Sequence, residues 1–358
     1  MSTADARRIG GEFELSTATL ADAGTATAAL PTIGAAHEHW LDTGRSALAV
    51  IAAHLAATAP AAVVWLPAYC CESVRAPFAR RGLPVSFYGV GSRLDRIDAA
   101  PRPGDTLLFV HYFGKRNLTA LERAPALRAA GVRLIEDCVQ AALSTGVGQA
   151  GDHALTSWRK LLACPDGALL ASRQPLELEL DEPDEGFVSA RSIGKLLRGD
   201  GAPAERFLPL FEASEARLSA DHPRALSWLS GQLLRQADLA QVALRRRANF
   251  ACLLGLLRAS AVLEQVRPVV EALSQGEVPL GLPVAVMPQR RDALRRHLAG
   301  DAIFCPVHWD LSHVNGDGFD EERALSSSML TLPIDQRYGE RDMHAILLSL
   351  STFFGVRP

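Results

Sequence analysis

The chain has 358 residues and a mass of 38.4 kDa, with 48% hydrophobic and 22% charged residues, which is ample material for a globular core. A net charge of −3 and a pI near 6.4 argue against the basic surface that nucleic acid or an anionic membrane would require. The N-terminal residues lack the apolar core of a signal peptide, and no apolar run is long enough to span a bilayer, so we expect a cytoplasmic protein.

Short β-branched segments alternate with helical segments in the first half of the chain. We expect helices over 46–60, 71–82 and 118–131, and strands over 61–67, 84–90, 104–114, 131–138, 153–158 and 167–172. Such alternation is typical of a mostly parallel sheet that helices cover on both faces. The predicted fold class is therefore α/β.

The pattern changes after residue 172, where an acidic, proline-containing break precedes polar helical segments. Residues 225–260 predict one or two long helices, and short strands alternate with helices from residue 278 onward. We therefore expect a large domain and a smaller α+β C-terminal domain. The predicted boundaries are 1–240 for the large domain, with a mostly helical insertion at 173–225, and 241–358 for the small one.

Two motifs argue against other kinds of site. None of the six cysteines forms a C-x-x-C pair, so we expect reduced thiols and no metal centre. Gly146, Gly148 and Gly151 have the G-x-G-x-x-G spacing of a dinucleotide site, which requires a strand before the glycines and a helix after them. A strand-like segment follows these glycines instead, so we interpret them as a surface turn.

Lys160 is one of only three lysines in a chain whose other 34 of 37 basic residues are arginine. It lies in an apolar setting between two predicted strands. A lysine amine can lose its proton and attack a carbonyl, which a guanidinium group cannot do. Schiff-base chemistry is one interpretation, and a surface lysine that shares a solvated face with Arg159 is the alternative.

Acidic residues end the predicted strand 131–138, at the position where open α/β sheets bind ligands. A carboxylate such as that of Asp137 can keep the ring nitrogen of pyridoxal 5′-phosphate (PLP) protonated, and this makes the cofactor an electron sink. Gln140 offers an amide donor for the ring hydroxyl. A helix cap or a structural ion pair is the alternative for the acid.

Two further loops can hold such a cofactor. The helix that begins near Gly44 offers free amides and a helix dipole to a phosphate, and Ser46 and Ser157 can complete the cradle. An ordinary capped helix is the alternative. Tyr69 or Cys71, after the predicted strand 61–67, can cover the cofactor ring.

Taken in chain order, these pieces resemble the DegT/StrS family of PLP-dependent nucleotide-sugar aminotransferases, which share the aspartate aminotransferase fold (fold type I). The resemblance covers roughly 35–172 and 235–350. The segments that carry it are TGRSAL (43–48), WLPAYCCESV (65–74), VHYFGK (110–115), IEDCVQA (135–141), GDHALTSWRKLLACPDGALL (151–170), RRRANF (245–250) and SSSMLTLPIDQRYGERDM (326–343).

The resemblance implies a role for each candidate residue. Lys160 would bind PLP as a Schiff base and act as general base and acid, and Asp137 would pair with the ring nitrogen. Gln140 would contact the ring hydroxyl, and the phosphate would be held by Gly44, Arg45, Ser46 and Ser157. It further implies glutamate as the amino donor, a keto-sugar nucleotide as the acceptor, and a homodimer.

Several positions depart from the family pattern. Arg45 replaces a threonine of the phosphate loop, and Cys71 replaces the ring-stacking aromatic residue, which leaves Tyr69 as a candidate for that role. His308 and Trp309 are candidates for the substrate pocket, with a packing role as the alternative. Two other functions stay open: a PLP enzyme of this fold that acts on a non-sugar aldehyde or ketone, and a non-catalytic binding or regulatory protein.

Overall fold

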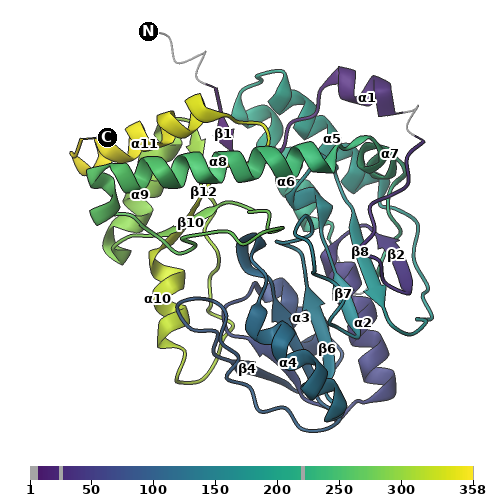
Figure 1. Ribbon diagram of the computed structural model, residues 1–358. Coiled ribbons are helices and arrows are strands. Elements are labelled where there is room, and N and C mark those ends of the chain that lie inside the picture. The colour runs from purple at the N-terminus through teal and green to yellow at the C-terminus, as the bar shows by residue number, and fades with distance from the viewer. Residues whose placement is uncertain (1–6, 24–26, 219–221, 358) are drawn as a thin grey trace.

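Seven strands form the central sheet of the molecule, of which the computed structural model describes residues 7–23, 27–218 and 222–357 (Figure 1). In sheet order the strands are β2 (His37–Leu41), β8 (Ala168–Ser172), β7 (His153–Leu155), β6 (Arg133–Asp137), β5 (Thr106–Val110), β3 (Val64–Pro67) and β4 (Val85–Tyr88). Only β8 runs against the others, because it is antiparallel to both of its neighbours. The prediction of a mostly parallel sheet is confirmed.

Helices pack against this sheet as the alternating pattern predicts. They are α2 (Gly44–Thr58), α3 (Glu72–Arg80) and α4 (Leu118–Ala129). Helix α2 contacts β7 and β8, α3 contacts β4, and α4 contacts β6. The strands β5 and β8 are buried along their whole length, which explains their unbroken apolar sequences.

Three helices follow the sheet: α5 (Glu185–Gly199), α6 (Ala204–Ala216) and α7 (Trp228–Gln236). Helices α5 and α6 lie within the predicted insertion 173–225 and pack closely against each other. Phe187 of α5 and Phe211 of α6 are buried between the elements of this pair. The insertion is therefore a packed helical hairpin that belongs to the body of the protein.

The C-terminal part consists of the long helix α8 (Leu239–Ala259) and a small antiparallel sheet with its helices. The strands are β9 (Arg267–Pro268), β10 (Leu282–Ala285) and β12 (Met329–Leu332), and the helices are α9 (Pro288–Gly300), α10 (Asp320–Ser328) and α11 (Glu340–Phe354). Helix α11 packs on α8, which crosses above the central sheet in Figure 1. In the part of the chain that the structure describes, no helix is both long and apolar enough for a membrane span.

The start of the chain crosses between these two parts. Strand β1 (Ile9–Gly10) pairs in parallel with β11 (Ile303–Phe304) of the C-terminal part, and a short helix α1 (Thr17–Ala23) follows. Residues 10–15 between them run over the insertion helix α5. The described residues also form the 3-10 helices η2 (Tyr112–Gly114), η3 (Trp158–Lys160) and η4 (Ala261–Glu264).

Candidate active site

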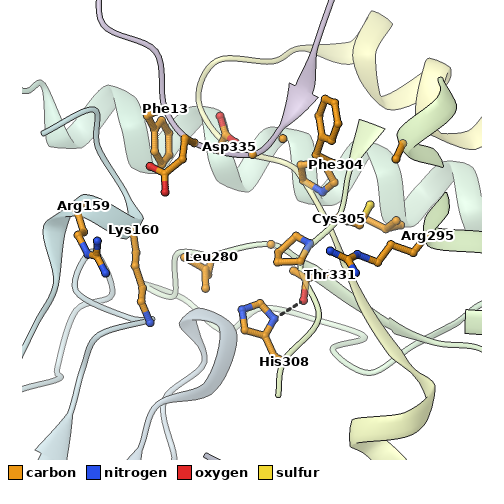
Figure 2. Close-up of a pocket in the computed structure, with 18 of the residues that line it drawn as sticks. Phe13, Arg159, Lys160, Leu280, Arg295, Phe304, Cys305, His308, Thr331 and Asp335 are labelled. Carbon is orange, nitrogen blue, oxygen red and sulfur yellow. Dashed lines mark hydrogen bonds between the residues drawn. The ribbon is translucent and has the colours of Figure 1, made fainter. Parts of the chain in front are cut away.

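Two cavities meet at Lys160 and Arg159, which line both of them. The smaller cavity has a volume of about 200 Å³, and the larger has a volume of about 890 Å³. The smaller one lies at the carboxyl ends of β2, β3, β6 and β7, where a parallel sheet leaves room for a ligand. The larger one extends from Lys160 toward the C-terminal part of the chain (Figure 2).

Most of the residues that the sequence singles out come together around the smaller cavity. Those that line it are Gly44, Arg45, Cys71, Asp137, Gln140, Ser157, Lys160 and Trp309. They derive from separate loops after different strands, and Trp309 comes from the C-terminal part. The fold thus brings together residues that are up to about 270 positions apart in the chain.

Three of the predicted residues lie elsewhere. Ser46 is fully buried in the helix cap, where its amide donates to the Thr43 hydroxyl. Tyr69 is fully buried outside the cavity lining, because its hydroxyl donates to the carbonyl of His308 and its ring packs on Trp309 at 5.4 Å between centroids. His308 lines the larger cavity, where its Nδ1 lies 2.9 Å from the Thr331 hydroxyl (Figure 2).

Lys160 ends the 3-10 helix η3, directly after β7, and its side chain remains accessible through the cavities. Burial lowers the pKa of its amine, and the nearby charge of Asp137 offsets part of that effect. A lower pKa increases the fraction of neutral, nucleophilic amine at physiological pH. Lys160 and Arg159 both line the two cavities, so the amine is accessible to a ligand there.

Asp137 presents a buried and poorly partnered carboxylate to the smaller cavity. Its Oδ1 accepts one hydrogen bond of 2.9 Å from the amide of Val139. Burial raises the pKa of Asp137, and the Val139 amide and the charge of Lys160 counter this only in part. A cationic group bound beside it would stabilise the carboxylate in its charged form.

Gln140 carries a buried hydrogen-bond donor without a partner. Its Oε1 accepts a bond of 2.7 Å from the amide of Phe113, which fixes the orientation of the side chain. Its Nε2 is buried and has no hydrogen-bond partner among the described residues. Gln140 also lines the smaller cavity, and a buried donor without a partner is costly.

The first turn of α2 forms the opposite end of the smaller cavity. Gly44 and Arg45 lie in the first turn of α2, so no carbonyl of that helix can accept a hydrogen bond from their amides. A β-carbon on Gly44 would lie 3.7 Å from Val139 and 3.9 Å from Ser157, inside the space that the cavity provides. Amine, carboxylate, amide donor and helix start together fit a phosphorylated pyridine aldehyde such as PLP.

Charged residues that the sequence analysis did not single out surround this end of the site. Glu215 of α6 accepts from Arg159 at 2.6 Å, from Arg191 at 2.8 Å and from Arg45 at 3.4 Å. Arg45 and Arg159 line the smaller cavity. The position of Arg159 beside Lys160 was the only local signal for this cluster, because Glu215 is 56 residues away in the chain.

Residues 10–13 line the larger cavity, and ion pairs of Glu12 and Glu14 join this segment to α5. Glu12 accepts from Arg191 at 2.6 Å and from the buried Lys195 at 3.1 Å. Burial alone would raise the pKa of Glu12, but the charges of Lys195 and Arg191 lower it to about 2. Glu14 likewise accepts from Arg198 at 2.8 Å. The start of the chain is thus part of the site.

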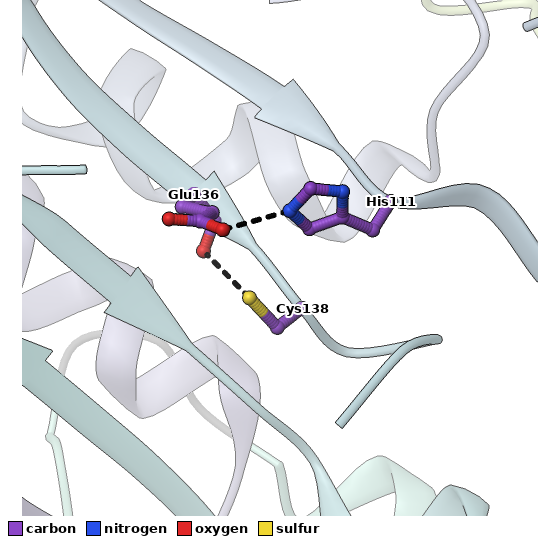
Figure 3. A group of neighbouring side chains, drawn as sticks. All are labelled: His111, Glu136 and Cys138. Carbon is purple, nitrogen blue, oxygen red and sulfur yellow. Dashed lines mark hydrogen bonds and ion pairs between the residues drawn. The ribbon is translucent and has the colours of Figure 1, made fainter. Parts of the chain in front are cut away.

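One other cluster has residue types that bind metals, namely His111, Glu136 and Cys138 (Figure 3). Its donor atoms are already used within the protein. His111 Nε2 lies 2.8 Å from Glu136 Oε1, and His111 Nδ1 accepts from the amide of Asn117 at 2.9 Å. The imidazole therefore donates through Nε2, and neither nitrogen has a lone pair free for a metal.

The same cluster explains the glycine-rich turn. The carboxylate of Glu136 accepts from the amides of Gly148 at 2.6 Å, Ala150 at 2.8 Å and Gly151 at 3.1 Å. Burial raises the pKa of Glu136, but His111 and these amides outweigh burial and lower it. Backbone amides that resemble a phosphate-binding loop in sequence thus bind a carboxylate of the protein itself.

No protein-family model and no curated protein matches this sequence. Among solved structures, the aminotransferase TlmJ from Streptoalloteichus hindustanus matches with a TM-score of 0.70 at 17% identity, over 98% of this chain and 99% of TlmJ. DesI, determined in the presence of its TDP-sugar product, matches with a TM-score of 0.67 at 17% identity, over 98% and 94%. The putative sugar aminotransferase Spr1654 from Streptococcus pneumoniae, in its PLP form, matches with a TM-score of 0.66 at 12% identity, over 97% and 98%. The chain therefore has the fold of these aminotransferases, and the predicted fold class is confirmed.

Proposed function

We propose that this protein is a PLP-dependent aminotransferase and a divergent member of the DegT/StrS family. The observation that carries the proposal is the smaller cavity, whose lining combines Lys160, the buried Asp137 and Gln140, whose Nε2 has no partner among the described residues. PLP, when bound, would supply an electron sink for the bond changes at the amino-bearing carbon. The shared fold with solved aminotransferases supports this assignment.

Each residue then has a definite role in the chemistry. Lys160 would hold the cofactor aldehyde in the resting protein. Once the amine of the substrate displaces it, the free Nζ would accept the proton from the substrate carbon and return it on the other side of the transfer. Asp137 would bind the protonated ring nitrogen, and Gln140 would donate from Nε2 to the ring hydroxyl. Burial and the charge of Lys160 lower the pKa of His308 to about 3, so this residue meets the substrate in the larger cavity as a neutral imidazole.

For the acceptor, a keto-sugar nucleotide with glutamate as the amino donor is our first choice. The larger cavity, at about 890 Å³, falls in the size range of sites for sizeable ligands and opens directly onto Lys160. DesI, which has the same fold, forms a TDP-sugar product. A non-sugar aldehyde or ketone is the second candidate. Residues 10–13 and the helices α5 and α6 contribute to the lining of the larger cavity, and the family resemblance does not cover these segments.

The first experiment is to purify the protein with PLP and record its absorption spectrum. We expect a yellow protein whose colour is lost on borohydride reduction, which fixes the cofactor to the chain; peptide mapping should then find the label on Lys160. A colourless protein that does not bind added PLP would reject the enzyme in favour of a non-catalytic role.

The second experiment separates the acceptors. The protein is incubated with glutamate and, in parallel, with keto-sugar nucleotides or simple aldehydes and ketones, and the aminated products are measured. Transfer to the sugar nucleotides is expected, and transfer to the simple carbonyl compounds alone would reject the sugar assignment. We also propose a homodimer, as the family resemblance implies, and light scattering of the purified protein tests it.

A further inference from the structure

We infer that Arg159 and Glu215 complete the phosphate-binding end of the cofactor site, with Arg159 binding the phosphate and Glu215 positioning both Arg159 and Arg45. This inference rests on the proposed function. It assigns a purpose to the helical insertion, because Glu215 belongs to the last turn of α6. It also explains why an arginine precedes Lys160 directly.

The geometry places two guanidinium groups at one end of the smaller cavity. Arg45 lies in the first turn of α2, and Arg159 lies next to Lys160 in η3. Glu215 holds both of them, with Oε2 3.4 Å from Arg45 and Oε1 2.6 Å from Arg159. Without that carboxylate, the two positive groups would repel each other and turn away from the cavity.

Each of these arginines has donors left over for a ligand. A guanidinium group has five N–H donors, and in the described part of the chain Glu215 is the only side-chain partner of Arg45 and of Arg159. Arg191, in contrast, is almost fully buried between Phe187 and Phe211 and also pairs with Glu12. Arg191 therefore anchors the cluster, whereas Arg45 and Arg159 face the cavity.

The charges in the cluster do not balance. Four cationic side chains, Arg45, Arg159, Arg191 and Lys195, surround the two carboxylates of Glu12 and Glu215, so two positive charges remain. Asp42, the other acid near Arg159, turns its Oδ1 to the amide of Thr43 at 2.5 Å and reduces this excess by one charge at most.

A phosphate group carries about −1.5 to −2 charges at pH 7 and three strong acceptor oxygens. Of these cations, Arg45 and Arg159 line the smaller cavity together with the start of α2 and Ser157, which are the other groups suited to bind phosphate. Arginine forms charge-assisted, often bidentate, hydrogen bonds with phosphate. The cluster therefore matches a phosphate in charge, donor number and position.

The test compares two ligands that differ only in the phosphate. Cofactor-free protein is titrated with PLP and with pyridoxal, and bound ligand is followed by absorbance. We expect Arg159→Gln to weaken PLP binding about 10- to 100-fold, the range for loss of a charge-assisted hydrogen bond, and to leave pyridoxal binding unchanged. Arg159→Lys should restore part of the PLP affinity, because it restores the charge.

Glu215→Gln tests the positioning role. We expect it to weaken PLP binding several-fold and to leave pyridoxal binding unchanged, because the two arginines lose their common anchor. Tighter PLP binding would mean that Glu215 competes with phosphate for the arginines, and this would overturn the positioning role. Arg206→Gln and Glu212→Gln, both exposed on the same helix α6, serve as matched controls and should change neither affinity.

The outcomes separate this inference from the function itself. If the unmodified protein binds neither PLP nor pyridoxal, the proposed function fails. If it binds PLP and Arg159→Gln binds PLP equally well, the function stands and the phosphate role of Arg159 is overturned. An equal loss for PLP and pyridoxal would show that Arg159 supports only the structure, which also overturns the inference.

Discussion

Two neighbouring residues at the end of β6, Glu136 and Asp137, point to opposite sides of the sheet and meet opposite surroundings. Glu136 is saturated, because a histidine and three backbone amides donate to its carboxylate. Asp137 has one amide donor and a raised pKa. A buried polar group with all its bonds made within the protein stabilises the fold, whereas one with bonds left over beside a cavity indicates a ligand.

The residues around Glu136 and those around Asp137 differ in the same way as the two carboxylates. Around Glu136, both nitrogens of His111 are also in use, so this imidazole has no lone pair left for a ligand. Around Asp137, the Nε2 of Gln140 is unpaired and the amine of Lys160 is open to both cavities. Residue type alone does not separate the two clusters, since both contain carboxylates beside basic groups.

The largest expected effect is on Lys160. Lys160→Ala should reduce transamination by more than about 10⁴-fold, because no other amine in the site can hold the cofactor and move the proton. Since the side chain faces cavities, the unfolding midpoint should change little. Activity assays and thermal unfolding measure the two effects, with Lys115→Ala as the control. Comparable activity in the Lys160 variant would remove this residue from its role.

Substituting Asp137 and Glu136 in parallel tests the comparison directly. Asp137→Asn should lower the rate about 10²- to 10³-fold with a small change in stability, because the cofactor ring loses its charged partner. Glu136→Gln should leave the rate per folded molecule near normal and cost about 2 kcal/mol in unfolding free energy, because an NH₂ group would face backbone donors. Steady-state kinetics and urea unfolding measure both, and the reverse pattern would contradict the comparison.

A smaller effect is expected at Gln140. Gln140→Glu keeps the acceptor for the Phe113 amide and removes the buried donor that has no partner among the described residues. PLP affinity should fall about tenfold, the value of one hydrogen bond to a ligand in a buried site. Titration of cofactor-free protein with PLP gives the affinity. An unchanged affinity would mean that the Nε2 group has no partner on the cofactor.

The smallest effect concerns a buried group that lies outside both cavities. His153 Nδ1 is buried and has no partner among the described residues, and burial together with the charge of His54 lowers the pKa of His153 to about 4. The unfolded state then binds more protons than the folded state between about pH 6.5 and pH 4, so stability falls as the pH decreases through that range.

This prediction is checked by urea unfolding of His153→Leu at pH 7 and pH 5. The unmodified protein should lose about 2 kcal/mol more than the variant between these two pH values. Equal losses would show that His153 is not the source of the pH dependence. If His153→Leu instead lost most transaminase activity at unchanged stability, His153 would belong to the site. That result would contradict the conclusion that only unpaired groups beside a cavity indicate a ligand.

Local sequence patterns located most of the smaller cavity. Asp137 ends one predicted strand and Lys160 follows another, and parallel strands bring their carboxyl ends to one edge. Gly44 was singled out as a helix start, and the strand before it, β2, was not predicted. The flanking segments also placed the Gly146–Gly151 turn outside any dinucleotide site. These inferences succeed because strand ends and turns depend on residues a few positions apart.

Long-range packing decided the remainder. Nothing in the spacing indicates that Glu215 bridges Arg45 and Arg159, or that Glu12 pairs with α5, because these partners are 56 to 183 residues apart. Tyr69 was equally suited to cover the cofactor by its position in the sequence. The fold buries its ring against Trp309, and it is Trp309 and Cys71 that line the cavity.

The sequence by itself determined the alternation of strands and helices from about residue 46 to residue 172, the mostly parallel sheet, and the presence of an amine and an acid near strand ends. Periodicity and turn chemistry encode these features locally. Only the tertiary structure decided which polar groups are saturated and which keep free bonds beside a cavity. Whether a buried donor or charge has a partner depends on side chains that distant segments bring to it, and no local pattern records that.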